Sequence, residues 1–209
     1  MNNKDRVRRI TTLSMLSALL IVMSATGIGF IPLPLIKATT MHIPVIIGAV
    51  LLGPKAGAFL GGVFGTCSIV INSLTPSIIS FAFSPFMSTT GIWGAIKAVW
   101  IALGCRILFG FVAGLLWELL KKVRLHNAIA LPVTAAIATI CHTLLVMGSI
   151  YILLAQQYAE AKNVAISVVF GLVMGTVASS GVPEAIAAAI LVTAIVLPLK
   201  SLVFKSGKR

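Results

Sequence analysis

The sequence predicts an all-α, polytopic membrane protein, in which one domain (1–209) forms a bundle of six transmembrane helices with extracellular-side loops over a ligand pocket. Three observations predict this fold class. Hydrophobic residues make up 59% of the chain and charged residues 10%, whereas soluble domains have about 45–50% apolar residues. The apolar residues form runs near the roughly 20 residues that a helix needs to cross a bilayer. The basic residues gather at the ends of these runs.

The charge of the chain indicates its topology. Sixteen Lys and Arg against four Asp and Glu give a net charge of +12, which in a soluble protein would suggest nucleic acid; here we expect no nucleic-acid partner. The segments 4–9, 55, 121–124 and 200–209 hold four, one, three and four of the basic residues. Because basic loops stay on the cytoplasmic side, we expect a multi-pass protein of the cell membrane with both termini in the cytoplasm.

The first helix is predicted over about 9–30, and Pro32 and Pro34 end it because proline lacks an N–H and disfavours helix at the preceding residue. The next apolar run, 43–53, is about half as long as a bilayer is thick. Either the segment 31–42 descends into the membrane in extended form, or the second helix is sharply shortened. Irregular backbone at membrane depth needs protein or a water-filled cavity beside it, so this segment is a candidate wall of a binding cavity.

The third helix, about 56–73, carries glycines at 57, 61 and 65, four residues apart. Such small-residue faces let two helices approach closely, so we expect internal packing there. The stretch 74–90 is predicted as a long external loop, and loops of this length are commonly lids or binding loops. The fourth and fifth helices are predicted over about 91–120 and 130–154.

The last apolar stretch, 164–203, is too long for one helix and is interrupted at Ser179-Ser180-Gly181-Val182-Pro183. If 164–178 crossed the membrane completely, the basic C-terminal end would face outward, against the charge bias. We therefore interpret 164–180 as a re-entrant or external helix and 183–203 as the sixth span.

Motifs for catalysis and metal binding are missing from the sequence. The four acids, Asp5, Glu118, Glu160 and Glu184, are dispersed, and no H-E-x-x-H, G-x-S-x-G or G-x-x-x-x-G-K-[ST] motif occurs. The three cysteines lie in apolar segments without CxxC spacing, as expected of packed thiols. We therefore expect no enzyme activity, no metal, no cofactor and no ATP site in this chain.

Ionisable side chains inside the predicted spans are candidates for function because their burial is costly. Trp93, Lys97 and Trp100 follow an i, i+4, i+7 pattern and so share one helix face. An ammonium between two indoles would bind a substrate carboxylate, with the rings as apolar walls. The alternative is a lysine that extends to the membrane interface among belt tryptophans.

Arg106 in the fourth helix and His142 in the fifth are further substrate-binding candidates, although a structural role is the alternative for both. Asn72 either contacts a ligand or caps the third helix. The remaining polar candidates, on the outer loops, are Thr39, His42 and Ser84. These residues predict one pocket on the extracellular side for a small, neutral-to-anionic organic molecule.

The first helix carries small residues in an otherwise bulky apolar sequence. Ser14 and Ala18 form a small-x-x-x-small pair with Ser17 alongside, a pattern that permits close docking of another membrane helix. Packing within the same bundle is the alternative.

Four stretches carry a family resemblance. They are Thr40-Met41-His42-Ile43-Pro44-Val45-Ile46-Ile47-Gly48, Leu52-Gly53-Pro54-Lys55-Ala56-Gly57, Phe64-Gly65 and Phe83-Ser84-Pro85-Phe86. With the basic start and the small pair in the first helix, the chain resembles, over essentially its whole length, the substrate-binding (S) components of energy-coupling factor (ECF) vitamin transporters. The family's A-x-x-x-A docking motif corresponds here to Ser14 and Ala18, with Ser in the first position.

The resemblance implies a high-affinity vitamin-binding subunit in which six helices bind a vitamin from outside and the loops after the first and third helices close over it. It also implies partners, namely a transmembrane coupling subunit that docks on the first helix and two ABC-type ATPases, which would explain the missing ATP motif. The layout is most similar to pantothenate-type members, with pyridoxine or another vitamin as alternatives. A stand-alone secondary transporter is the other open hypothesis.

Overall fold

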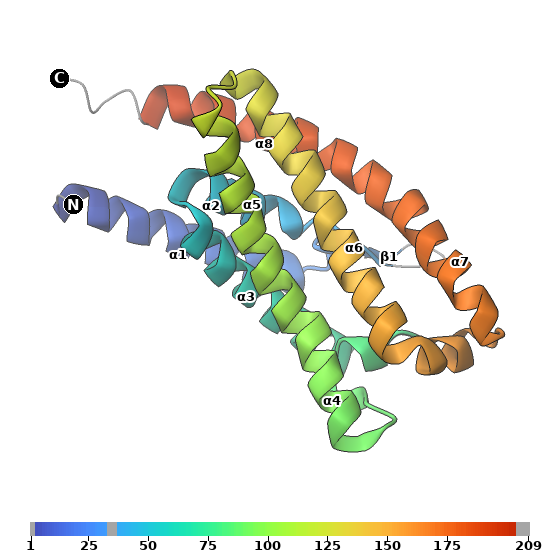
Figure 1. Cartoon of the computed structure of the whole chain (residues 1–209). Helices are drawn as coiled ribbons and strands as arrows, with labels where there is room; N and C mark the ends of the chain where they lie inside the picture. Colours follow the sequence, from blue (N-terminus) through green and yellow to red (C-terminus); the bar gives the residue numbers. More distant parts are fainter. Residues whose placement is uncertain (1–2, 33–36, 204–209) are drawn as a thin grey trace.

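The computed structural model describes residues 3–32 and 37–203 and consists mainly of helices (Figure 1). The helices are α1 (Asn3–Ala25), α2 (His42–Leu52), α3 (Pro54–Leu74), α4 (Gly91–Val99), α5 (Cys105–Lys122), α6 (Asn127–Lys162), α7 (Ile166–Thr176) and α8 (Val182–Val203). Two π-helical stretches, η3 (Trp100–Gly104) and η4 (Val177–Gly181), join α4 to α5 and α7 to α8. The short elements are the strands β1 (Phe30–Pro32) and β2 (Lys37–Thr39) and the 3₁₀ turns η1 (Ser80–Ala82) and η2 (Pro85–Met87).

Five helical segments of the described chain are long and apolar enough to cross a membrane. They are Asn3–Ala25, Pro54–Leu74, Gly91–Lys122, Asn127–Lys162 and Ile166–Leu199. The shorter apolar helix α2 packs against α1, α3, α5, α6 and α8. The predicted class, a helical multi-pass membrane protein, is therefore confirmed, with five to six candidate spans in the described chain.

The chain between α1 and α2 contains extended backbone where the structure describes it, and α2 is short, while the depth of this segment in the membrane stays a prediction. α1 ends at Ala25, earlier than predicted, and Gly27 then adopts a φ of 76°, which glycine tolerates because it has no Cβ. β1 and β2 pair antiparallel, with Phe30 opposite Thr39, so this backbone is extended, and α2 is also short at 11 residues. The residues of α2 from His42 to Val50 are all buried, as expected of a helix that is apolar on all sides.

α3 and α5 pack with their backbones in close approach, as the glycine spacing predicts. A Cβ atom on Gly61 would collide with the carbonyl oxygen of Arg106. The next residue, Gly62, has a looser environment, because its Cβ would lie 3.7 Å from Ile107 Cγ1. The glycine at 61 therefore lets α3 fix the backbone position of Arg106.

α6 is longer than the predicted helix 130–154. It runs from Asn127 to Lys162, so the eight residues after the predicted end at 154 are also helical. Leu154 has non-helical φ and ψ of −135° and 22°, which kinks the helix where the prediction ended it. Next to this kink, Lys97 Nζ donates a hydrogen bond to the carbonyl oxygen of Leu153 at 3.1 Å.

The last apolar stretch differs from the prediction. Residues 166–203 form one continuous helical run, because η4 joins α7 to α8, so 164–180 is not a separate re-entrant helix. A π turn has a wider hydrogen-bonded ring than an α turn, and this turn accommodates the Ser-Ser-Gly sequence just before Pro183, which lacks an N–H. The predicted sixth helix is thus the second half of a longer rod.

The two ends of the bundle differ in charge. Figure 1 shows both ends of the described chain and the α5–α6 turn toward one end, and the start of α4 and the α6–α7 turn toward the other. The first end carries the basic residues of α1 and the last turn of α5. There, Arg9 Nη2 donates a hydrogen bond to the carbonyl oxygen of Leu52 at 2.8 Å, which joins the basic start of α1 to the end of α2.

Candidate functional site

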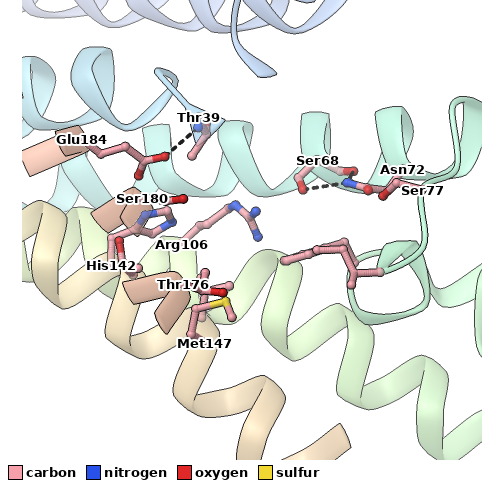
Figure 2. Close-up of a pocket in the computed structure, with 14 residues that line it drawn as sticks. Thr39, Ser68, Asn72, Ser77, Arg106, His142, Met147, Thr176, Ser180 and Glu184 are labelled. Carbon is pink, nitrogen blue, oxygen red and sulfur yellow. Dashed lines mark hydrogen bonds between the residues drawn. The ribbon is translucent and has the colours of Figure 1, made fainter. Parts of the chain in front are cut away.

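A cavity of about 100 Å³ lies among α3, α5, α6 and the α7–α8 rod (Figure 2). Ten of the fourteen lining residues have polar side chains, and the other four are apolar. The lining consists of Thr39, Ser68, Asn72, Ser77, Ile79, Phe83, Arg106, His142, Thr143, Val146, Met147, Thr176, Ser180 and Glu184. Residues from both halves of the sequence therefore converge on one cavity.

Helical spacing explains how the sequence directs these side chains to one place. Ser68 and Asn72 are four residues apart on α3, and Thr176, Ser180 and Glu184 are four apart along the α7–α8 rod, so each set shares a helix face. The π-helical stretch η4 borders the site, because it contains Ser180, and the carbonyl oxygens of Ile101 and Ala102 in η3 accept hydrogen bonds from Arg106. Such π turns are frequent at functional sites.

Arg106 is the cation of the described lining. Its side chain is 4% exposed, and Nη1 donates to the carbonyl oxygens of Ile101 at 3.2 Å and Ala102 at 2.8 Å, both in η3. The guanidinium carbon lies 4.6 Å from the ring centre of Phe64 and 5.2 Å from that of Phe83, within cation–π range. Among the described residues Nε has no hydrogen-bond partner and no acid pairs with the guanidinium. A buried cation of this kind is a candidate site for an anion.

Two buried histidines lie next to each other beside the cavity. His142 lines it, and the ring centre of His42 lies 6.2 Å from that of His142. The rings of Phe64 and Phe109 lie 5.7 and 4.7 Å from His142 on its other sides. Neither ring nitrogen of His142 has a hydrogen-bond partner in the described part of the chain, although buried polar groups normally have one. A neutral imidazole offers one donor and one acceptor, and the described residues use neither of them.

α3 and the loop after it form a hydrogen-bond network at the cavity. Asn72 Nδ2 donates to the carbonyl oxygen of Ser68 at 2.8 Å, and Asn72 Oδ1 accepts from Ser80 Oγ at 2.9 Å. Ser80 Oγ also accepts from the backbone N–H of Ser77 at 2.8 Å. Asn72 therefore holds the loop against α3, in addition to lining the cavity.

Glu184 links the α7–α8 rod to the β1–β2 hairpin. Its Oε1 accepts a hydrogen bond from the backbone N–H of Thr39 at 2.9 Å, drawn as a dashed line in Figure 2. Both residues line the cavity. Glu184 is the acidic residue of the described lining, so the lining contains one basic and one acidic side chain.

Four of the nine predicted substrate-binding residues line the cavity, namely Thr39, Asn72, Arg106 and His142. Two more, His42 and Ser84, are buried nearby: His42 stacks on His142, and Ser84 Oγ shares a 2.7 Å hydrogen bond with Ser73 Oγ. The structure therefore brings six of the nine together, and their contact with substrate stays a prediction.

Lys97, Trp93 and Trp100 lie away from the cavity. The two indole side chains are 72% and 50% exposed on the outer surface, and Lys97 is half-buried against α6. The reason is the rotation of this helix, whose buried side carries two small residues that allow close packing, Gly94 and Ala98. The cation of the cavity is thus Arg106 in place of the expected Lys97.

Sequence reasoning missed ten lining residues, and the sequence holds a signal for some of them. They are Ser68, Ser77, Ile79, Phe83, Thr143, Val146, Met147, Thr176, Ser180 and Glu184. The polar residues at 176, 180 and 184 recur every four positions in an otherwise apolar stretch, the pattern of a polar helix face. The predicted boundaries assigned 176 and 180 to a re-entrant or external helix and 184 to the sixth span, so these three residues were not recognised as one helix face.

The predicted docking residues lie on the outside of α1. Ser14 and Ala18 are exposed, and Ser17 is half-buried with its Oγ donating to the carbonyl oxygen of Leu13 at 2.9 Å. Bulky apolar neighbours such as Met15, at 67% exposure, flank them. The small pair is therefore not used for packing within the described bundle.

Comparison with known proteins gives a family. The profile of the family described as "ECF transporter, substrate-specific component" matches residues 8–196. The chain is also 31% identical over 197 residues to a protein of Lactococcus lactis subsp. cremoris (strain MG1363) named pantothenic acid transporter PanT. That alignment covers 92% of this chain and 94% of the relative. The chain therefore belongs to the family of substrate-specific components of ECF transporters.

Proposed function

We propose that this chain is the high-affinity pantothenate-binding subunit of an ATP-driven ECF uptake transporter. The observation that carries the proposal is the cavity, where a buried guanidinium without an acidic partner among the described residues lies beside hydroxyl, amide and apolar side chains. The similarity over nearly full length to a protein named as a pantothenic acid transporter supports the same substrate.

The chemistry of pantothenate matches the lining. Its carboxylate suits Arg106, since charge-assisted hydrogen bonds are the strong ones in a buried site. Its amide can exchange hydrogen bonds with the free ring nitrogens of His142. Its methyl groups can pack on the apolar side chains of Val146, Met147 and Phe83.

The small size of the cavity supports a mechanism in which its wall moves to admit substrate. A volume of about 100 Å³ is smaller than the roughly 300–1,000 Å³ of typical small-molecule pockets. Two parts of the wall lie outside the long helices, namely Thr39 in β2 and the segment 77–83 after α3. We propose that these segments move apart to admit the vitamin and then close over it.

The outer face of α1 is the proposed docking surface for a transmembrane coupling subunit. Exposed Ser14 and Ala18 leave room for a second helix to approach closely. Two ATPases would supply the energy, in keeping with the missing nucleotide motif. The basic residues of α1 and α5 at one end of the bundle favour cytoplasmic termini, with the cavity opening to the outside.

Calorimetric titration of the detergent-purified chain tests the substrate. We expect one pantothenate per chain, and a loss of affinity of at least about tenfold in Arg106→Gln, the effect of losing a charge-assisted hydrogen bond. Lys122→Gln, which removes an exposed charge at the end of α5, is the matched control. Tighter binding of pyridoxine or another vitamin than of pantothenate would overturn the assignment.

Uptake into proteoliposomes tests the energy source. We expect accumulation of labelled pantothenate when the chain is reconstituted with a coupling subunit, two ATPases and internal ATP. The chain alone should bind without accumulating substrate. Concentrative uptake by the chain alone would identify a stand-alone transporter instead.

A further inference from the structure

The two charged groups of the cavity do not pair with each other. Arg106 directs Nη1 to carbonyl oxygens of its own helix, and Glu184 directs Oε1 to the backbone of Thr39. No ion pair between them occurs in the described structure, although both line one small cavity. Because unpaired charge is costly to bury, this separation suggests that each group is kept for a different part of a ligand.

The polar side chains that line the cavity lie in two groups, on opposite sides of Arg106. In Figure 2, Glu184 and Ser180 lie on one side of the Arg106 guanidinium, and Ser68 and Asn72 lie on the other. On the side with Asn72, both polar atoms of the Asn72 amide already form hydrogen bonds, with Ser68 and Ser80. The side with Glu184 holds a carboxyl group, whose two oxygens accept hydrogen bonds in the ionised form.

Glu184 can accept further hydrogen bonds. A carboxylate has about four lone-pair positions on its two oxygens, and the described bonds of Glu184 use one of them, from Thr39 N–H. A hydroxyl group of a ligand is a donor that suits the remaining positions. A second anionic group there would be repelled, because like charges brought together in a desolvated site cost several-fold to many-fold in affinity.

We propose that Glu184 is a specificity-determining residue that accepts a hydrogen bond from the terminal hydroxyl of the substrate, while Arg106 binds the carboxylate at the opposite end. This rests on the proposed function, and it predicts which relatives of the vitamin the site rejects. The phosphate monoester of the terminal hydroxyl carries about −1.5 to −2 charges at pH 7, so it would place its charge against Glu184. The site then takes up the free hydroxy acid and excludes its phosphorylated form.

Three ligands measured by calorimetry on the purified full-length chain test the proposal. They are pantothenate, the phosphate monoester of its terminal hydroxyl, and an analogue in which hydrogen replaces that hydroxyl. For the unmodified chain we expect the ester to bind at least about 100-fold more weakly than pantothenate. The deoxy analogue should bind about tenfold more weakly, as for loss of a hydrogen bond to a charged group.

Glu184→Gln removes the charge and keeps an acceptor oxygen. We expect it to reduce the discrimination against the ester by at least about tenfold, whereas pantothenate itself loses less affinity. Glu160→Gln is the matched control, since Glu160 is an exposed acid near the end of α6 that bonds Gln156. Its ratio of affinities for pantothenate and ester should equal that of the unmodified chain.

The outcomes separate this inference from the proposed function. An unmodified chain that does not bind pantothenate contradicts the proposed function. A chain that binds pantothenate but shows the same discrimination with Glu184→Gln contradicts the role of Glu184 alone. If Glu184→Gln does not fold, the deoxy analogue decides on the unmodified chain: equal affinity for this analogue and pantothenate would overturn the hydroxyl contact.

Discussion

Replacing Gly61 by Ala tests the close approach of α3 and α5 that positions Arg106. The added Cβ would overlap the carbonyl oxygen of Arg106, and a backbone atom cannot rotate away as a side chain can. Overpacking of this kind typically costs about 1–3 kcal/mol, while exchanging Gly for Ala inside a helix gains about 1 kcal/mol. Because the contact is with backbone, we take the upper cost and expect the free energy of unfolding to fall by about 2 kcal/mol.

The neighbouring residue supplies a control on the same helix. A Cβ on Gly62 would lie 3.7 Å from Ile107 Cγ1, an ordinary contact, so Gly62→Ala should keep stability or raise it by up to about 1 kcal/mol. Unfolding of both variants by SDS in mixed micelles measures the stability, and pantothenate titration measures the effect on Arg106. We expect Gly61→Ala to lose affinity as well. Equal stability and affinity in the two variants would refute the proposed role of the helix contact.

Three further substitutions have distinct expected outcomes. Arg106→Lys keeps the charge without the planar donor fork, so its pantothenate affinity should fall between those of the unmodified chain and Arg106→Gln. Ala18→Trp should abolish uptake in the reconstituted complex while calorimetric binding to the isolated chain persists; loss of both would contradict a docking role. Lys97→Ala removes the bond to Leu153 at the α6 kink, so stability should fall by about 1 kcal/mol with affinity kept, and lost affinity at normal stability would identify Lys97 as a ligand contact.

Much of the helical layout follows from local signals in the sequence. The predicted third and fourth helices, 56–73 and 91–120, differ by only a few residues from Pro54–Leu74 and Gly91–Lys122. Gly53-Pro54 and Gly91 mark these boundaries, because glycine and proline restrict where a helix starts and stops. The glycines of α3 also predicted the close packing correctly. Glycine weakens a helix, so glycines that recur every four residues indicate that another helix packs closely against that face.

The rotation of each helix about its axis could not be predicted from local signals. The face of Trp93 and Lys97 is chemically attractive for a ligand, but Gly94 and Ala98 decide which side packs inward. Small residues permit contact at a distance that aromatic residues prevent. Arg106, one of the predicted residues, is therefore the cation that lines the cavity, whereas Lys97 lies outside it; contact of either residue with substrate stays a prediction.

The burial of α2 has a consequence for how the chain is assembled in the membrane. At 1.5 Å per residue its 11 residues span about 16 Å, about half of the roughly 30 Å hydrocarbon layer. A segment this short is not expected to insert into the membrane on its own. Its surface is buried by other helices and does not contact lipid. We therefore expect α1 and α3 to insert first and α2 to be drawn between them as the longer helices associate. His42, beside the ligand cavity, would then reach its position in the last stage of biogenesis.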